Sequence, residues 1–508
     1  MRYSIPVLAL GLVLQGCAVG PDYHRPTVRG TDGPWSQGAG ALAANTAPLD
    51  VAPWQSLGDP TLTGLIEAAV AHNLDLREAQ ANLRMARAQR DAAAGHRLPE
   101  LDAAASAVEE QISANGQLPV NRIQGFNRRI SLYDVGFDAS WEIDLWGGTR
   151  RTVEAARQRS QAAQARQHDR LLQVVAEVVR TYAELRGSQA NLAAARKDAE
   201  AQSAIARLVQ QRFEVGEASS LDNARAASRA HTAAAAVAGI DASVHAAANE
   251  LALLTGQPPE SLVDLATSDA PIPSAPAAVA VGLRADILRR RPDIRAAEAD
   301  LAAATNDVGV ESANLFPTFS LVGSLGQQAQ HPGDLGLGAS TYFSVGPSLR
   351  WPIFAGGSIR AQIRAADARA DAAGARYEKA VLGALSDSET AINRYAAART
   401  TLDERETARK RSAEALEITR QRFQKGDDDR VTLLEAESSY ATAERAWISA
   451  AQESLEDYAA LVKALGGGWE PGSADQEWTS SSLRNGAAVA AVVAEPLRTS
   501  SNSSNRAR

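Results

Sequence analysis

The chain has 508 residues, of which 5% are aromatic, and a formal net charge of −8 at pH 7. Its acidic and basic residues are interspersed, which does not indicate a nucleic-acid partner. The single cysteine excludes an intramolecular disulfide and a cysteine metal cluster. The chain has no internal run of about 18 apolar residues, which argues against a membrane-spanning helix. The many alanine, arginine, glutamine and glutamate residues favour long, thin helices packed through small side chains.

The N-terminus has the pattern of a bacterial lipoprotein signal. A basic start followed by an apolar run to Leu14 predicts a secretory signal peptide over residues 1–16. The sequence Leu-Gln-Gly-Cys that ends at Cys17 resembles a lipobox, in which Cys17 is the acylated first residue of the mature chain. The alternative is an ordinary signal with a cysteine there by chance. Ala18, by resemblance to bacterial sorting rules, directs the protein to the outer membrane, and residues 17–60 are predicted to form a lipidated extension without its own core.

Two short motifs mark an internal duplication. The first is Arg212-Phe213-Glu214-Val215-Gly216, and the second is Arg422-Phe423-Gln424-Lys425-Gly426. Each Arg-Phe-x-x-Gly motif is typical of a helix stop, because glycine takes the left-handed conformation that ends a helix. We therefore predict these parts: a first repeat over 61–257, a linker rich in proline over 258–279, a second repeat over 280–470 and a disordered tail over 471–508.

Within each repeat the hydrophobic period changes from two to that of a helix. From Tyr133 to Leu145 apolar and polar residues alternate over a length that suits a tilted crossing of the bilayer, and Tyr133, Trp141 and Trp146 fit an interfacial aromatic girdle. The predicted strands lie at Leu101–Ile112, Tyr133–Leu145, Phe319–Leu325 and Phe343–Ile353. Long helices with coiled-coil spacing follow the strands, from Thr149 to Phe213 and from Ile359 to Phe423.

The four strands decide the fold class. Four strands cannot close a barrel around a channel, and an open sheet edge is excluded from lipid. Three chains would supply twelve strands. We therefore predict an α+β fold, internally duplicated, with a long α-helical coiled-coil barrel and a transmembrane antiparallel β-barrel completed by trimerisation, with four strands per chain.

These features resemble the TolC-like outer-membrane factors of tripartite efflux systems, in the lipoprotein branch (NodT- and OprM-like) that serves pumps of the resistance-nodulation-division (RND) type. The motifs that support the resemblance are Cys17 with Val19-Gly20-Pro21-Asp22-Tyr23, Leu288-Arg289-Arg290-Arg291-Pro292-Asp293-Ile294, the two turns, and Ala464-Leu465-Gly466-Gly467-Gly468-Trp469.

The resemblance implies a passive homotrimeric duct for drugs or other small molecules. It would be lipid-anchored in the outer membrane of a Gram-negative bacterium and extend into the periplasm. Its partners would be outer-membrane lipid, a periplasmic adaptor protein and an inner-membrane RND-type transporter. One alternative is a duct for type I protein secretion; another, from a different class, is a structural periplasmic coiled-coil lipoprotein.

No catalytic constellation is present in the sequence. The seven histidines lack metal-ligand spacing, and there is no phosphate-binding loop or nucleophile elbow, so we predict no enzyme, no metal and no cofactor. Arg289, Arg290 and Arg291 could form an anion site, but a helix start at Pro292, with Asp293 in its first turn, explains the segment better.

The second turn is acidic and is the predicted periplasmic gate. In a trimer, Asp427, Asp428 and Asp429 would each form a ring of charges that favours cations. By resemblance, Val431 is the constricting apolar residue of the gate and Glu435 its further acid. The alternative is a solvated loop that keeps the tip soluble. The residues predicted to contact the adaptor are those of the two turns: Arg212, Phe213, Gly216, Arg422, Phe423 and Gly426.

Overall fold

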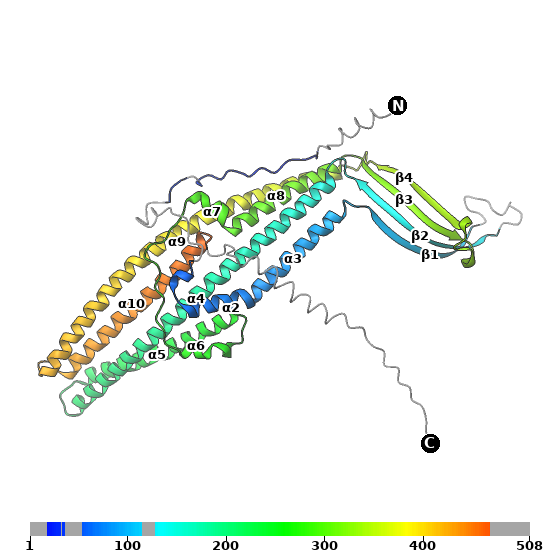
Figure 1. Cartoon of the computed structure of the whole chain (residues 1–508). Coiled ribbons are helices and arrows are strands. Elements are labelled where there is room, and N and C mark those ends of the chain that lie inside the picture. The colour runs from blue at the N-terminus through cyan, green and yellow to red at the C-terminus, as the bar shows by residue number, and fades with distance from the viewer. Residues whose placement is uncertain (1–17, 32, 36–52, 114–126, 468–508) are drawn as a thin grey trace, which may run out of the picture.

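The computed structural model describes residues 18–31, 33–35, 53–113 and 127–467, and it shows an elongated molecule with a helical body and a sheet at one end (Figure 1). The predicted signal peptide (1–16), Cys17 and the predicted tail (471–508) lie outside the described residues. The elements of the first half are η2 (Gln55–Leu57), α2 (Pro60–His72), α3 (Leu74–Gly95), β1 (Glu100–Gln111), β2 (Arg129–Ile143), α4 (Gly148–Glu214) and α5 (Ser220–Leu254).

The second half repeats this order of helix, two strands, long helix, turn and second long helix. Its elements are η4 (Pro259–Leu262), α6 (Val263–Thr267), α7 (Arg284–Arg290), α8 (Pro292–Ala313), β3 (Thr318–Ala329), η5 (Pro332–Asp334), η6 (Gly338–Ser340), β4 (Thr341–Arg350), α9 (Ser358–Lys425) and α10 (Arg430–Ala464). None of the helices in the described ranges combines the length and apolar character needed to cross a membrane.

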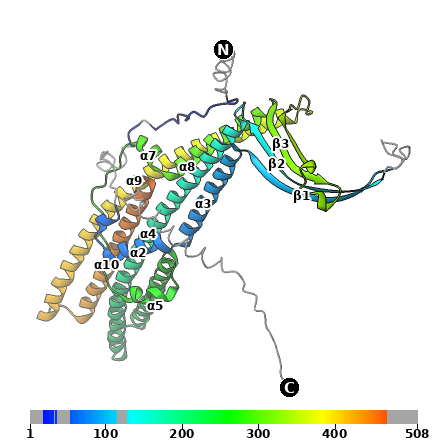
Figure 2. The same cartoon turned by 45° about the vertical axis from the view of Figure 1, so that its right-hand side comes forward.

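The four strands form one curved antiparallel sheet in the order β1-β2-β3-β4 (Figure 2). Cross-strand partners lie on the same face, so Phe137, Leu325 and Phe343 form part of one apolar face. This face is uncovered: the Phe343 side chain is 77% exposed. The opposite face contains the interleaved polar residues, among them Asp134 and Asp138. The predicted combination of long helices with four alternating strands is confirmed.

The strand bounds differ from the prediction: β2 begins earlier, at Arg129, and β3 continues to Ala329, whereas β2 and β4 end early because tight turns end the ladder. β2 stops at Ile143, where the Leu145 N–H turns back to the Ile143 carbonyl at 2.9 Å. β4 stops at Arg350, and the Ile353 N–H bonds the Trp351 carbonyl at 3.0 Å. The apolar alternation therefore continues for a few residues beyond the sheet.

Trp146, one of the predicted girdle residues, lies at the junction of the sheet and the helices. Its ring stacks on Phe316 with the ring centres 4.7 Å apart, and its indole N–H donates to the Pro317 carbonyl at 2.8 Å. Since Phe316 and Pro317 precede β3, Trp146 joins the two repeats where the sheet meets the helices.

The helix α4 has 67 residues and α9 has 68, which corresponds to rods of about 100 Å at about 1.5 Å per residue. The predicted seam of α4 is fully buried at Val178, Tyr182 and Leu185. Gly187, the internal glycine of this helix, lies against α10: a Cβ at this position would overlap the Gln452 amide. Glycine here allows the two repeats to approach closely.

The segments outside the repeats contribute to the core, which the sequence did not predict. Trp35 and Trp54 are buried in the main hydrophobic cluster, and the Trp35 indole donates to the Gly282 carbonyl at 2.8 Å. In the linker, α6 packs on α5. The buried Arg186 of α4 holds the linker by donating to the Ser268 carbonyl at 2.8 Å.

Candidate functional site

The two turns lie at the tips of the long helices, at the opposite end of the molecule from the sheet (Figure 1). Both turns have the same backbone hydrogen bonds. In each, the glycine N–H donates to the phenylalanine carbonyl at 3.0 Å, and the next N–H donates to the arginine carbonyl, at 2.7 Å in the first turn and 2.9 Å in the second. These bonds define a Schellman helix end. The glycines have φ of 81° and 82° and open space around them, so only the backbone conformation requires glycine. The six residues that the sequence predicted to contact the adaptor all lie in these two turns: Arg212, Phe213, Gly216, Arg422, Phe423 and Gly426.

An ion pair joins the two turns of one chain. Arg212 Nη2, at the end of α4, lies 3.0 Å from Asp429 Oδ2, at the start of α10. Both side chains are partly exposed, so water and salt weaken their attraction. The partners are 217 positions apart in the sequence, and for this reason no local pattern indicated the contact.

Asp429 is also the N-cap of α10. Its Oδ1 accepts hydrogen bonds from the Thr432 N–H and the Thr432 hydroxyl, each at 2.9 Å. These bonds, and then the bond from Arg212, lower the pKa of the Asp429 carboxyl to about 2. Asp429 is therefore a carboxylate with two structural tasks, capping the helix and joining the turns.

The other predicted gate acids have different surroundings. Asp428 is half-buried and pairs with Arg422 of its own turn at 3.0 Å. Asp427 and Glu435 are exposed, and neither has an ion-pair partner within the described part of the chain. Of the four acids, Asp427 and Glu435 are thus the ones whose charge is not locally balanced.

The apolar residues of the tips are unevenly covered. Val431, in the first turn of α10, is half-buried, and so is Phe423, whose ring centre lies 5.8 Å from the Arg430 guanidinium. Phe213 is 42% exposed. The first turn therefore presents the more open apolar side chain.

The first turn leads into α5 through a capping box. The Asp222 N–H donates to the Ser219 hydroxyl oxygen at 3.1 Å, and the Asp222 carboxylate accepts from the Ser219 N–H at 3.4 Å. The hydrogen bond from the Ser219 hydroxyl is the largest of the causes that lower the pKa of Asp222. The cap fixes the direction in which the chain enters α5.

Above the tips, α10 is bonded to α4 by a short polar chain. The Gln202 amide donates to the Ser438 hydroxyl at 2.8 Å, and that hydroxyl donates to Asp198 Oδ1 at 2.7 Å. Next to it, the buried Leu434 packs against Ile205. The tips of the two repeats are therefore held together by both polar and apolar contacts.

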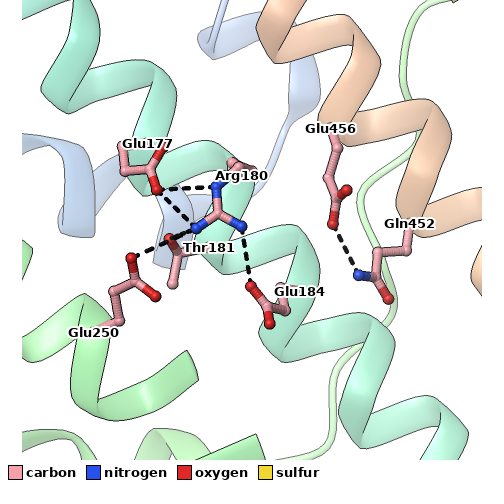
Figure 3. Close-up of polar contacts among 7 residues, drawn as sticks. All are labelled: Glu177, Arg180, Thr181, Glu184, Glu250, Gln452 and Glu456. Atoms are coloured by element: carbon pink, nitrogen blue, oxygen red, sulfur yellow. Dashed lines mark hydrogen bonds and ion pairs between the residues drawn. The ribbon is translucent and has the colours of Figure 1, made fainter. Parts of the chain in front are cut away.

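Further along α4, Arg180 binds acids on two helices (Figure 3). Its guanidinium lies 2.7 Å from Glu177 and 3.1 Å from Glu184 on α4, and 3.5 Å from Glu250 on α5. On α10, burial raises the pKa of Glu456, which accepts a hydrogen bond from Gln452 at 2.8 Å. Polar contacts thus continue between the long helices well above the tips.

At the sheet end, the N-terminal segment is fixed to both repeats. The Val19 N–H donates to the Trp146 carbonyl at 3.0 Å. Asp22 forms an ion pair with Arg151 of α4 at 2.7 Å, and Arg25 pairs with Glu298 of α8. Cys17 itself lies outside the described residues, but its neighbour Ala18 contacts Gly147 at the start of α4.

The arginine motif has a structural role at Arg291. Its side chain bonds Asp293 at 2.7 Å and donates to the Ala464 carbonyl at 3.0 Å. Pro292 starts α8, as predicted. Among the described residues, no three His, Cys, Asp or Glu side chains are arranged to hold a metal ion.

The architecture defines a class of protein: long helical hairpins, closed by tight turns at one end and joined at the other to a sheet with an uncovered apolar face, are the parts of an outer-membrane efflux channel. The chain belongs to the outer membrane efflux protein family, whose family model matches residues 65–257 and 283–467.

Individual relatives agree with this assignment. Outer membrane protein OprJ of Pseudomonas aeruginosa is 31% identical over 478 residues, which cover 92% of this chain and 97% of OprJ. Nodulation protein T of Rhizobium leguminosarum bv. trifolii is 29% identical over 470 residues, covering 92% and 98%. The structure of the outer-membrane channel OprN has a TM-score of 0.80 and 37% identity, covering 90% of this chain and all of that one. The open-state MtrE channel of Neisseria gonorrhoeae has a TM-score of 0.73 and 28% identity, covering 89% and 99%.

Proposed function

We propose that the chain forms a passive homotrimeric duct of a tripartite efflux pump, without enzymatic activity. The observation that best supports this function is the four-stranded sheet, whose outer strands β1 and β4 each have one unpaired edge. Its apolar face is uncovered over Val135, Phe137 and Phe343. Lipid excludes unpaired backbone groups, so pairing of β1 with β4 of the next chain satisfies both edges, and three chains give twelve strands.

The helices then form a tube that continues the barrel. The N-terminal segment lies against α4 and α8, through Asp22 with Arg151 and Arg25 with Glu298. Since this segment leads from the lipid anchor at Cys17, it must lie outside the tube. Val19 bonds Trp146 at the sheet end, which is the level of the inner leaflet of an outer membrane.

The turns at the far end suit the periplasmic adaptor, through Phe213 and the Schellman glycines, and an inner-membrane RND-type transporter supplies the energy. The relatives support such partners: the name of TtgF, 30% identical over 478 residues, describes it as the outer membrane protein of a toluene efflux pump.

The oligomer and the anchor have a direct test. We expect a heat-modifiable trimer in the outer-membrane fraction, labelled by radioactive palmitate. The variant Cys17→Ser should lose the label. A monomer that is extracted without detergent after this substitution would contradict the duct.

The gate is the second part of the proposal. In the trimer, Asp427 and Glu435 form the acidic rings whose charges are not balanced by nearby arginines, and Val431 lies between them. Asp427→Asn with Glu435→Gln should lower cation selectivity in planar bilayers. Asp428→Asn combined with Arg422→Gln is the matched control, because it removes an acid together with the arginine that balances it and leaves the net charge unchanged. Unchanged selectivity in the double variant would contradict the ring, as would an equal loss in the control.

A further inference from the structure

The polar face of the sheet contains an unusual aromatic residue, Tyr342 of β4. Within the described strands it is the one aromatic side chain on this face. It pairs with Gly326 of β3, which pairs with Gly136 of β2. Partners in register lie on one face, so Tyr342 follows a row of two glycines across the sheet.

The tyrosine ring lies flat over these glycines. A Cβ at Gly326 would come within 2.8 Å of the Tyr342 Cζ and hydroxyl oxygen, and a Cβ at Gly136 would lie 3.3 Å from that oxygen. Tyr342 is half-buried although most of its neighbours on β4 are exposed. The missing side chains of the two glycines thus provide the space in which the ring lies.

The far end of the ring is held by hydrogen bonds. The Tyr342 hydroxyl donates to Asp134 Oδ1 at 3.1 Å. The second oxygen of Asp134 accepts from the Gln328 amide at 3.0 Å. Three strands therefore fix one side chain: β4 supplies the ring, β2 its acceptor and β3 the amide that orients the acceptor.

We propose that Tyr342 determines the free width of the barrel: held flat, the ring leaves the lumen open to bulky cargo, and its release narrows the channel. A strand side chain without such restraints stands roughly perpendicular to the sheet, which on this face means into the lumen. Three rings, one from each chain, would then point into the lumen at the same level. The inference rests on the proposed function, since the polar face lines a lumen only in the closed barrel.

Gly326→Ala tests this role. The atoms that its Cβ would meet are at the far end of the Tyr342 side chain, so the ring rather than the backbone moves. At Gly136 the nearest atoms are backbone, at 2.9 and 3.0 Å, so that position would disturb the sheet. Gly346→Ala is the matched control: Gly346 lies on the same face of β4, and a Cβ there meets nothing within 4 Å.

The readout is active export in cells that contain the cognate adaptor and pump, because the periplasmic tip is then open and does not limit passage. Efflux of a large macrocyclic compound and of a small aromatic dye carried by the same pump is measured for each variant. We expect Gly326→Ala to lower export of the large compound relative to the small one, Gly346→Ala to keep the wild-type ratio, and Gly326→Ala with Tyr342→Ala to restore it.

Asp134→Asn provides a second route, because it weakens the acceptor without adding volume, and it should shift the ratio in the same direction. A wild-type ratio in both Gly326→Ala and Asp134→Asn overturns the inference, as does an equal shift in Gly346→Ala or no recovery in the double variant. Failure of the wild-type chain to form an outer-membrane oligomer or to support any export contradicts the proposed function instead.

Discussion

The ion pair between Arg212 and Asp429 allows a sharp test of whether this link holds the proposed gate closed. Asp429→Asn removes the charge but keeps an N-cap acceptor for Thr432, whereas Asp429→Ala loses both. An ion pair this exposed contributes about 0.2–1 kcal/mol. A trimer contains three such links, so Arg212→Ala should shift the balance between closed and open tips by about 0.6–3 kcal/mol if all three act.

The assay is the fraction of time that single channels spend open in planar bilayers at low salt. Arg212→Ala and Asp429→Asn should each raise the open fraction, and the double variant should add little to either, because the link is already broken. Raising the salt concentration should reduce the difference in open fraction between the wild type and each variant. Fully additive effects, or an unchanged open fraction, would refute a link that holds the tip closed.

Three further outcomes follow from the geometry. Because the pKa of Asp429 is lowered to about 2, its contribution should be complete above about pH 4, the ordinary value of an aspartate. It should be lost as the pH falls toward about 2, and the open fraction of Asp429→Asn should lack this transition. Gly187→Ala should destabilise the fold of each chain by about 1–3 kcal/mol through overpacking against Gln452; the midpoint of thermal unfolding should show this loss, and Gln452→Ala should reverse it. Trp35→Ala, which removes a buried ring from the main core, should cost about 3–5 kcal/mol in the same assay, and a midpoint equal to wild type would mean that the segment does not pack as described.

The sequence predicted those features that depend on local periodicity or turn chemistry. The alternation around Phe137 and the coiled-coil seam through Val178 fix strand and helix directly, and the two Arg-Phe-x-x-Gly motifs fix the turns. The strand ends were less accurate, because apolar alternation continues through Leu145 and Ile353 although turns have already ended the ladder.

Features that depend on tertiary contacts could not be predicted from the sequence. Trp35 and Trp54 lie in stretches rich in glycine, proline and alanine that read as an extended chain, and only the fold brings them into the core. The stacking of Trp146 on Phe316 of the other repeat joins residues that no local pattern connects. Asp428 and Asp429 form a charge run in the sequence, whereas the structure gives each its own arginine.

The bond between Val19 and Trp146 has a consequence for assembly in the membrane. With Cys17 acylated as proposed, only Ala18 would separate this fixed point from the lipid, so the tether would have almost no slack. The acyl chains and the lower rim of the sheet must therefore enter the bilayer at one depth. The anchor would then set how deep the sheet enters the bilayer before neighbouring chains pair their strand edges.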